Sequence, residues 1–346
     1  MKIWNFGIIG AGLIADFHAK AIQSLQNAKL IGICGSNPEK VRILAEKYNC
    51  KIFSGYEEML RSGEIEIVTI ATPSGTHMEP AIEAARHGKH VICEKPLEIS
   101  LERIDKMIES HAKAGTSMGG IFNYRFNDSL KYLKSAIENS RFGTISYASV
   151  HVPWWRNESY YKDSWHGTLK LDGGGALMNQ SIHMIDILQY LMGPVDSLQA
   201  YTATLAHSIE VEDTATAILL FKNKALGMIY GSTASFPGQF RRLEITGTKG
   251  TVIQVENSFK MWQFADQTET DIEIFNKFNK IVGGGGVSDP SAIPFEPHAK
   301  NIAAFIQSVE TGHPFEIDGP EARKAVEIIL AIYSSAKEMK PFYFMG

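Results

Sequence analysis

The sequence predicts an α/β protein in two parts, an N-terminal doubly wound parallel sheet and a C-terminal α+β part with a mostly antiparallel sheet. Three observations lead to this prediction. In the first third of the chain, short apolar runs alternate with amphipathic stretches, which is typical of strands joined by crossover helices. After about residue 123, strand-like runs follow one another with little helix between them. The length of 346 residues is that of two domains, and 44% of the residues are hydrophobic and available for their cores.

The N-terminal elements are placed one by one by this alternation. Strands are expected at 6–9, 29–34, 65–71, 90–93 and 118–122. Helices are expected near 14–26, 38–48, 77–87 and 100–114, and Gly, Pro or Asn punctuates most junctions. Strands separated by helices predict a parallel sheet that is covered on both faces, with right-handed crossovers.

The C-terminal elements follow a different pattern. A helical stretch at 127–139 precedes the strand-like segment "GTISYASVHV". Further strands are expected at 196–206, 214–221, 225–235, 240–247, 250–256 and 259–264, and helices near 297–310 and 319–338. "GGGG" at 283–286 is expected to be a loop, either a lid or a plain disordered connection. We expect a dinucleotide-binding domain at 1–122, as argued below, and a substrate-binding and oligomerisation domain at 123–346.

Composition argues against several classes of partner. The formal net charge is −4 and there is no Lys/Arg block, so neither nucleic acid nor a membrane surface is expected. No apolar run is long enough to span a bilayer, and no signal peptide is expected. The three cysteines include no CxxC pair, which favours reduced thiols in a cytoplasmic protein. The histidines show no ligand spacing, so no metal site is expected.

The first candidate site is the glycine turn in "FGIIGAGLIADFH", residues 6–18. Gly10 permits a tight turn, Gly12 lets the backbone approach a pyrophosphate, and Ala15 allows close packing of helix on strand. The start of the helix offers free N–H groups to the phosphates. The turn therefore predicts dinucleotide binding by Gly10, Gly12, Leu13, Ile14 and Ala15, and the alternative is a tight turn without a ligand.

The end of the second strand bears on the choice between NAD and NADP. An Asp or Glu that binds the ribose 2′-hydroxyl is usual here in NAD-selective proteins, but this chain has Gly35 and Ser36. Because no carboxylate stands at this strand end, none would repel a 2′-phosphate. Ser36, Asn37 and the nearby Lys40 or Arg42 are candidates to bind such a phosphate. The residues lean weakly toward NADP, and NAD remains open.

Two further clusters carry chemistry. "HVICEKP" ends a strand with Glu94, Lys95 and Pro96, so Lys95 is expected extended at the mouth of the crevice, or alternatively as a plain surface lysine. In "LDGGGALMNQSIHMIDILQYLMGP", residues 171–194, Asn179 and His183 are four apart on an apolar helix, and Asp186 is a candidate to orient the imidazole. Histidine suits acid–base work near neutral pH, while the alternative is a core histidine satisfied by Asp186.

These motifs together resemble one family. "GIIGAGLIADFHAKA", "ATPSGTHMEPAIEAARHGKHVICEKP", "DGGGALMNQSIHMID" and "ITGTKGTV" are similar to the glucose-fructose oxidoreductase/inositol dehydrogenase/MocA family over nearly the whole chain. The resemblance implies a Rossmann domain and a second domain with a large open sheet that builds dimers or tetramers. It also implies oxidation or reduction of a hydroxyl or carbonyl on sugars and cyclitols with NAD or NADP.

The resemblance also implies roles for individual residues. Lys95 and His183 match the family's proton-transfer pair, whereas Asn179 stands where many members have Asp and can position substrate but not titrate. The positions that match the nicotinamide-lining loop are Thr72, Pro73 and His77, and Glu94 is expected beside the cofactor. Tyr124 and Arg125 match the strand exit that faces the substrate.

The segment 153–183 is most similar to the branch that oxidises C3 of UDP-N-acetylglucosaminuronate, although His166 stands where that branch has Arg. Arg156 is a candidate clamp for a carboxylate or phosphate, and Trp165 a candidate to stack on a sugar or base. Trp154, Trp155, Tyr160 and Tyr161 are further stacking candidates, and the alternative for all of them is an aromatic-rich core loop. Arg241 and Arg242 are expected to be sheet-face or interface charges rather than ligands, and His298 to reach the substrate or cap a helix.

The function expected from the residues and the resemblance is hydride transfer between a nicotinamide and a secondary hydroxyl or ketone of a sugar. Lys95 or His183 is expected to take the proton. The alternatives are a myo-inositol or simple-sugar dehydrogenase, a glycosidase of the same fold that uses NAD transiently, and a non-enzymatic NAD(P) sensor.

Overall fold

The computed structural model describes residues 2–280 and 294–345, and the chain divides into two compact units. Unit 1 consists of Met1–Asn123, Lys170–Gly173 and Pro294–Val326. Unit 2 consists of Tyr124–Leu169, Gly174–Ile293 and Glu327–Gly346. The expected lid at 283–286 lies outside the described residues.

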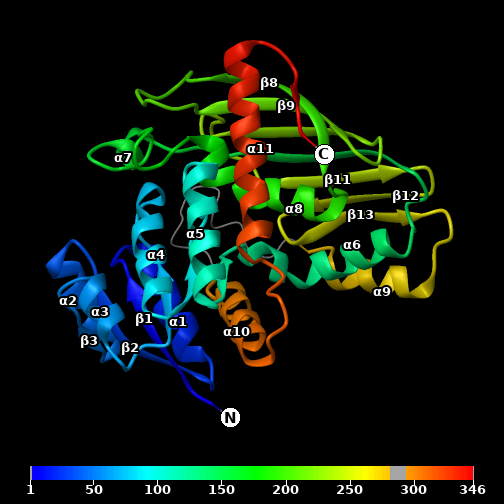
Figure 1. Ribbon diagram of the computed structural model, residues 1–346. Helices are drawn as coiled ribbons and strands as arrows, with labels where there is room; N and C mark the ends of the chain where they lie inside the picture. The colour runs from blue at the N-terminus through cyan, green and yellow to red at the C-terminus, as the bar shows by residue number, and fades with distance from the viewer. Residues whose placement is uncertain (1, 281–293, 346) are drawn as a thin grey trace. The chain divides into compact units, whose positions relative to one another are not determined.

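Unit 1 is built on a six-stranded parallel sheet in the order β3-β2-β1-β4-β5-β6, which confirms the predicted doubly wound architecture (Figure 1). The strands are β1 (Trp4–Ile9), β2 (Ala28–Cys34), β3 (Lys51–Ile52), β4 (Ile67–Ile70), β5 (His90–Cys93) and β6 (Met118–Gly120). Because β1 and β4 are neighbours, the strand order reverses between them. That is the place where such sheets bind ligands, outside the carboxyl ends of the strands.

Helices complete unit 1, and their local sequence explains where they begin and end. They are α1 (Leu13–Ser24), α2 (Pro38–Tyr48), α3 (Tyr56–Arg61), η1 (Ser74–Thr76), α4 (Met78–Arg86), α5 (Leu101–Ala114) and α10 (Glu296–Thr311). Ala15, Ala19 and Ile22 follow helical spacing and give α1 a fully buried face. The Ser100 side chain caps α5, and Gly115 ends it in the left-handed region with φ 67°. The strands are near-continuous apolar runs because both faces of the sheet are covered.

Unit 2 contains an eight-stranded sheet in the order β13-β12-β11-β7-β10-β9-β8-β14. Only β7 and β10 pair in parallel, so the sheet is mostly antiparallel, as predicted. Its strands are β7 (Ile145–Pro153), β8 (Val195–Ala203), β9 (Thr214–Phe221), β10 (Leu226–Ser232), β11 (Arg242–Gly247), β12 (Gly250–Val255), β13 (Ser258–Phe264) and β14 (Phe342–Tyr343).

The helical elements of unit 2 cover one side of this sheet, where η3 and α8 contact the strands β7, β9 and β10. They are α6 (Asp128–Glu138), α7 (Glu158–Tyr161), η3 (Ala176–Ser181), α8 (Ile182–Met192) and α9 (Glu269–Phe278). Two elements have residues in both units, η2 (Asn123–Phe126) and α11 (Gly319–Glu338). In β9, Ala217 and Leu219 are buried, whereas Ile218 between them is 64% exposed. This alternation is the pattern of a strand covered on one face.

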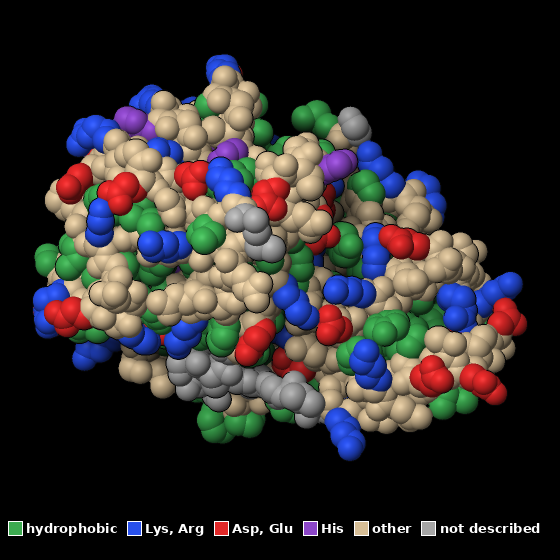
Figure 2. Space-filling view, turned by 90° about the horizontal axis from the view of Figure 1, so that it is seen from below, with side chains coloured by type: hydrophobic (Ala, Val, Ile, Leu, Met, Phe, Trp, Pro, Cys, Tyr) green, Lys and Arg blue, Asp and Glu red, His purple; other side chains and the backbone are tan. Residues whose placement is uncertain are grey.

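The structure adds elements that the residue pattern did not predict, namely β3, α3, α9 and β14. The strands β3 and β14 are two residues long each, and such short elements give weak periodic signals. None of the described helices combines the length and apolar character needed to cross a bilayer. On the face drawn in Figure 2, basic and acidic side chains are interspersed and form no single basic surface.

Candidate active site

The glycine turn lies at the carboxyl end of β1. Gly10 has φ +122°, and a Cβ there would stand 2.3 Å from the carbonyl oxygen of Ala71 beyond β4. Gly12 is the N-cap of α1 without a side-chain cap, and a Cβ on it would meet nothing within 4 Å. Space is therefore open beside Gly12 at the start of α1, while Ala15 is fully buried. This arrangement fits the pyrophosphate of a dinucleotide, with Leu13 and Ile14 supplying N–H groups.

Three strand ends lie in a row along this edge of the sheet. Ile9 pairs with Ile70, and Ile70 pairs with Cys93. Gly10, Thr72 and Lys95 follow these three residues by one or two positions each. Register alone therefore brings the glycine turn, the Thr72-Pro73 segment and the Glu94-Lys95 segment to one edge, as predicted for a parallel sheet.

The end of β2 carries the residues expected near the adenosine ribose. Ser36 and Asn37 are exposed, and the Asn37 side chain accepts a hydrogen bond from Lys40 N–H at 3.0 Å, which caps α2. Arg42 is paired with Glu39 at 2.7 Å and Glu46 at 2.6 Å. Asn37 and Arg42 thus have partners within α2, whereas Ser36 stands exposed at the strand end.

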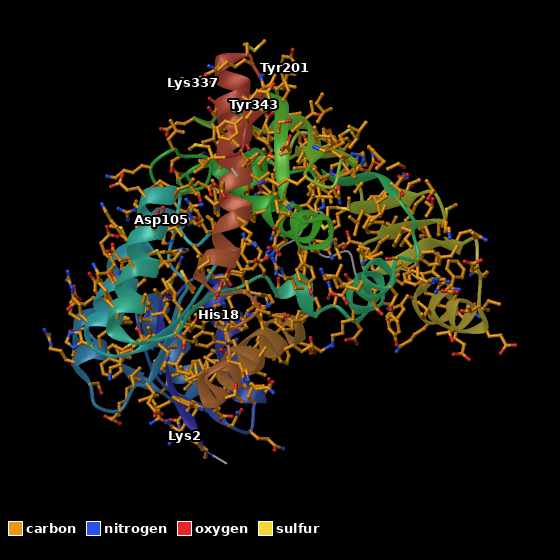
Figure 3. The ribbon with its side chains drawn as sticks, turned by 45° about the vertical axis from the view of Figure 1, so that its right-hand side comes forward. Lys2, His18, Asp105, Tyr201, Lys337 and Tyr343 are labelled. Carbon is orange, nitrogen blue, oxygen red and sulfur yellow. The ribbon has the colours of Figure 1, made fainter. Side chains whose placement is uncertain are left out.

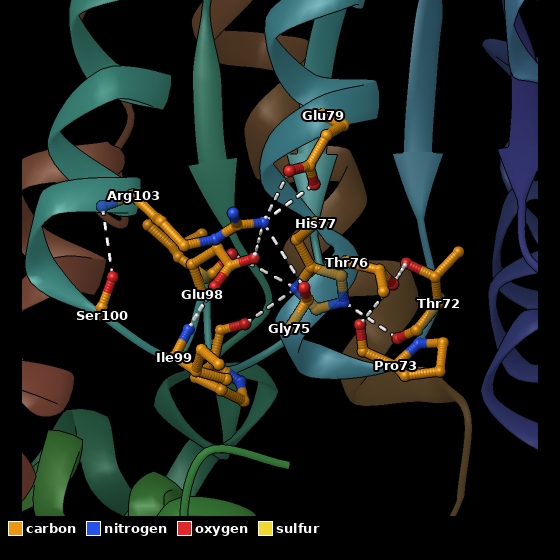
Figure 4. Close-up of polar contacts among 12 residues, drawn as sticks. Thr72, Pro73, Gly75, Thr76, His77, Glu79, Glu98, Ile99, Ser100 and Arg103 are labelled. Atoms are coloured by element: carbon orange, nitrogen blue, oxygen red, sulfur yellow. Dashed lines mark hydrogen bonds and ion pairs between the residues drawn. The ribbon is translucent and has the colours of Figure 1, made fainter. Parts of the chain in front are cut away.

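His77 ties the ends of β4 and β5 together (Figure 4). Its Nε2 lies 2.9 Å from the carbonyl oxygen of Thr72, and its Nδ1 lies 3.0 Å from that of Pro96. The side chain is 1% exposed, so it contacts backbone on both sides. Thr76 Oγ1 donates to the carbonyl oxygen of Pro73 at 2.7 Å and closes the short η1 turn. The predicted nicotinamide-lining residues Thr72, Pro73 and His77 are therefore held as one rigid group.

An ion-pair cluster beside this group was not found from the sequence. Arg103 Nη2 lies 2.9 Å from Glu98 and 2.8 Å from Glu79, as Figure 4 shows. Glu98 is fully buried and also accepts the N–H of Ile99 at 2.6 Å. The cluster joins α4, α5 and the turn after Pro96. Glu98 and Arg103 are five positions apart, but Glu79 lies 24 positions before Arg103, so no local pattern indicates the cluster.

Glu94 is a buried carboxylate with several partners. Its Oε1 accepts a hydrogen bond from His18 Nε2 at 2.8 Å, and its Oε2 accepts the N–H of Lys95 at 3.1 Å. Burial by itself raises the pKa of Glu94, but the hydrogen bond from His18 and the electrostatic interactions with His18, His298 and Lys95 outweigh it and hold the pKa at about 2. Glu94 is therefore ionised at neutral pH.

His18, Glu94 and His298 form a buried trio that sequence reasoning missed, although His298 had been considered for the substrate pocket or a helix cap. Their ligand-type atoms all lie within 4.8 Å of one another, a group that is chemically able to hold a metal ion. Burial lowers the pKa of His298 to about 4, so this imidazole is neutral. Its Nδ1 lies 3.2 Å from Asn123 Nδ2, which donates to it. His298 thus lies inside unit 1 and is not the N-cap of α10, which is Phe295.

In unit 2, Gly174 and Gly175 lead into the helical stretch that carries Asn179 and His183. A Cβ on Gly175 would stand 1.7 Å from the carbonyl oxygen of Glu212, so only glycine fits there. The Glu212 carboxylate accepts the N–H groups of Gly175 and Leu177, both at 2.9 Å, and the hydroxyl of Tyr333 at 2.9 Å. Burial raises the pKa of Glu212 to about 7, because these hydrogen bonds only partly offset desolvation.

His183 is half-buried and stacks on Tyr124, with ring centroids 4.5 Å apart. The Arg241 guanidinium covers the same tyrosine at 3.7 Å. Arg241 is 6% exposed and paired with Glu256 at 3.2 Å, so it is not an exposed sheet-face charge. Tertiary packing buries it against Tyr124, which no local pattern indicates. Arg242 is exposed, as expected.

Arg125 and Asp186 form a buried bidentate ion pair. Arg125 Nε donates to Asp186 Oδ2 at 2.7 Å, and Nη2 donates to Oδ1 at 2.5 Å. The guanidinium also lies 4.3 Å from the ring centroid of Tyr190. The pair joins η2 to α8, which carries His183. A part for Arg125 in substrate binding remains a prediction.

The remaining predicted substrate residues meet in an aromatic cluster of unit 2. His166 stacks on Tyr160 with centroids 4.4 Å apart and an interplanar angle of 11°, and its Nδ1 accepts from Asn179 Nδ2 at 3.2 Å. Trp165 contacts His166 at 3.9 Å between centroids. The Arg156 guanidinium lies 5.5 Å from the Tyr160 ring. Asn179, Trp165 and Arg156 therefore surround one histidine–tyrosine stack, which offers both stacking and hydrogen-bonding groups.

Comparison with known proteins agrees with this arrangement. Residues 4–119 match the family model of the NAD-binding Rossmann-fold oxidoreductases, and residues 130–253 match the GFO/IDH/MocA C-terminal domain. The crystal structure of the WlbA dehydrogenase from Bordetella pertussis, in complex with NADH and UDP-GlcNAcA, superposes with a TM-score of 0.91 at 32% identity, over 100% of this chain and 99% of that one.

Two curated relatives act on other polyols and sugars. Myo-inositol 2-dehydrogenase of Thermotoga maritima is 26% identical and covers 97% of both chains. Glucose-6-phosphate 3-dehydrogenase of Bacillus subtilis is 31% identical over 67% of this chain and 69% of the relative. The fold, the glycine turn and these matches together show that the chain belongs to the GFO/IDH/MocA family of NAD-binding sugar oxidoreductases.

Proposed function

We propose that this enzyme oxidises the C3 hydroxyl of a UDP-N-acetyl-hexuronate with NAD. The observation that supports it most is the similarity over the full length, at 32% identity, to a dehydrogenase structure that holds NADH and UDP-GlcNAcA. The aromatic cluster of unit 2 fits such a substrate, because Arg156 suits a carboxylate or diphosphate and Trp165 suits a sugar or base face. Tyr124, Arg125 and Asn179 are proposed to complete the substrate site.

Lys95 and His183 are the proposed proton-transfer residues. When bound, the nicotinamide supplies the hydride acceptor, so the alcohol carbon loses a hydride and its hydroxyl loses a proton. Lys95 or His183 takes that proton, and the product is a ketone. The Asn179 amide does not titrate, so its role is to hold a substrate hydroxyl. Burial of Glu94 and the His77 bridge keep the Lys95 segment in place.

We propose that residues 1–122 bind the cofactor through Gly10, Gly12, Leu13, Ile14 and Ala15, and that 123–346 bind substrate. The relatives that hold cofactor hold NADH, and none of them supports the lean toward NADP. Ser36 is the residue that would meet a 2′-phosphate. Changing Ser36 to Asp should weaken NADP binding at least about tenfold and leave NAD binding within about twofold, because the new carboxylate repels phosphate. Fluorescence titration with both dinucleotides measures this.

We also propose that the enzyme is a cytoplasmic homodimer or homotetramer that associates through the sheet of unit 2. Tyr201, Ile218 and Leu226 are 57%, 64% and 59% exposed on strands β8, β9 and β10. Apolar side chains on three neighbouring strands favour burial against another copy. Light scattering of Ile218→Lys against the unchanged protein tests this, and an unchanged oligomer mass would contradict it.

Absorbance at the reduced-nicotinamide band tests the reaction. Purified enzyme is mixed with NAD or NADP and, in turn, UDP-N-acetylglucosaminuronate, myo-inositol and simple hexoses. We expect the absorbance of reduced nicotinamide to increase with the nucleotide sugar. Lys95→Met should lower turnover about 10²–10⁴-fold and retain cofactor binding. Lys113→Met, which changes an exposed lysine of unit 1, is the matched control. Undiminished turnover in Lys95→Met would remove Lys95 from the mechanism.

A myo-inositol or simple-sugar dehydrogenase is the second candidate, and the full-length match to the Thermotoga maritima enzyme favours it. An increase in reduced-nicotinamide absorbance with inositol and not with the nucleotide sugar would favour this second candidate. An NAD-using glycosidase would instead release sugar from a glycoside with no accumulating reduced cofactor.

A further inference from the structure

The buried polar cluster of unit 1 converges on the residue before Lys95. His18 on α1 and His298 on α10 lie beside the Glu94 carboxylate, and these two rings contact Thr69 on β4 and Asn123 after β6 in turn. His18 is fully buried, and Figure 3 labels it among the elements of the Rossmann unit. Its Nδ1 lies 2.5 Å from Thr69 Oγ1, and its Nε2 lies 2.8 Å from Glu94 Oε1. Both nitrogens of this ring are therefore occupied by side chains of the same unit.

Hydrogen-bond chemistry sets the direction of the contact with Glu94. An ionised carboxylate only accepts, so His18 Nε2 carries the proton and donates it. The other carboxylate oxygen accepts the N–H of Lys95 at 3.1 Å. Glu94 therefore connects the α1 imidazole to the backbone of Lys95 through two hydrogen bonds.

Residues of α10 form the other side of this cluster. His298 Nε2 lies 3.9 Å from Glu94 Oε1, and Asn123 Nδ2 donates to His298 Nδ1 at 3.2 Å. One turn further along α10, Asn301 accepts the N–H of Phe122 at 3.1 Å. Two hydrogen-bonded anchors thus hold α10 against the end of β6, and His298 covers Glu94 from that side.

We propose that His18 is a positioning residue for Lys95, which it holds in place through Glu94. The proposal rests on the role given to Lys95 under the proposed function. The distances favour a hydrogen-bonded clamp over a metal site, because His18 Nε2 and Glu94 Oε1 already stand at hydrogen-bond distance. The clamp fixes the main chain at the point where the strand ends and the lysine side chain begins.

A matched pair of substitutions isolates the contact with Glu94. Glutamine at position 18 places an amide nitrogen near the place of Nε2, where it donates to Glu94, whereas asparagine reaches only the place of Nδ1, beside Thr69. We expect His18→Asn to lower kcat by about 10–100-fold with KM and the NADH dissociation constant within about threefold, since misplacing a reacting group acts on the chemical step. His18→Gln should recover about tenfold of that loss.

Hydrogen exchange supplies a readout that needs no turnover. Exchange at the peptide that contains Lys95 should be about tenfold faster in His18→Asn than in His18→Gln, because the carboxylate that accepts this N–H is no longer held. Thr69→Val keeps the volume of the side chain and removes only the outer hydrogen bond. Thr69→Val should also speed exchange at the Lys95 peptide, by a smaller factor. This variant replaces the His18 variants in the test if those do not fold.

Equal turnover and equal exchange in the two His18 variants would overturn the proposal. So would one bound metal ion per chain that is lost in His18→Asn, because the trio would then be ligands. The proposed function fails separately, if Lys95→Met keeps full turnover. With Lys95→Met inactive as expected, adding His18→Asn should cause no further loss, and an additive loss would show that His18 acts by another route.

Discussion

Glu212 makes the stability of unit 2 depend on pH in a direction opposite to that of most carboxylates. The group is buried, and desolvation raises its pKa from 4.5 to about 7. Its carboxylate holds the N–H groups of Gly175 and Leu177 at the start of the stretch that leads to His183. The perturbation is Glu212→Gln, which keeps the shape and removes the titration.

The magnitude follows from the difference between the folded and unfolded pKa. Below about pH 4.5 Glu212 is protonated in both states, and its contribution to stability is fully present. As the pH rises through 7, the folded state must ionise a buried carboxylate, and the contribution is lost. A difference of about 2.5 pH units at about 1.4 kcal/mol each is a loss of about 3 kcal/mol.

Urea unfolding at a series of pH values measures this, with tryptophan fluorescence as the signal, since four of the five tryptophans lie in unit 2. The stability of Glu212→Gln relative to the unchanged protein should rise by about 3 kcal/mol between pH 4.5 and pH 8. Glu210→Gln is the matched control, since this exposed carboxylate lies two residues away, and its relative stability should stay flat. A flat difference for Glu212→Gln as well would refute the reasoning.

Three other predictions concern the glycine turn, the Arg125–Asp186 ion pair and unfolding at acid pH. Gly12→Ala should fold and weaken NADH binding, measured by fluorescence, because its Cβ enters space left for phosphate, whereas Gly10→Ala should lower the melting temperature markedly because its Cβ strikes the Ala71 carbonyl. Wild-type NADH affinity in Gly12→Ala would contradict this. Arg125→Met should cost about 3–5 kcal/mol in urea unfolding by removing the bidentate partner of the buried Asp186 carboxylate, and a cost under about 1 kcal/mol would argue against burial of the pair. Glu94, with its pKa lowered to about 2, contributes stability above pH 4.5 that is lost as the pH falls toward 2, so acid unfolding of Glu94→Gln should lack this component.

Much of the fold could be predicted because its signals are local. Apolar runs alternating with amphipathic stretches are enough to predict a parallel sheet, since covered strands and crossover helices have distinct periods. The glycine turn was also readable, because Gly10 and Gly12 occupy positions that demand small residues. Strand register then placed Lys95 on the same edge, as strand order predicts. Short elements such as β3 and β14 were not predicted, because a strand of two residues shows no hydrophobic periodicity.

The partners of the site residues could not be predicted in this way. His18 and His298 lie 280 positions apart and meet at Glu94 only because α1 and α10 pack together in unit 1. Arg241 looked like a surface charge, and tertiary packing buries it on Tyr124. The sequence by itself therefore determined the residue types, the strands and the turn that suit a dinucleotide, through short-range sterics and periodicity. The tertiary structure decided burial, hydrogen-bond partners and pKa values, because these depend on which distant segments exclude water from a group.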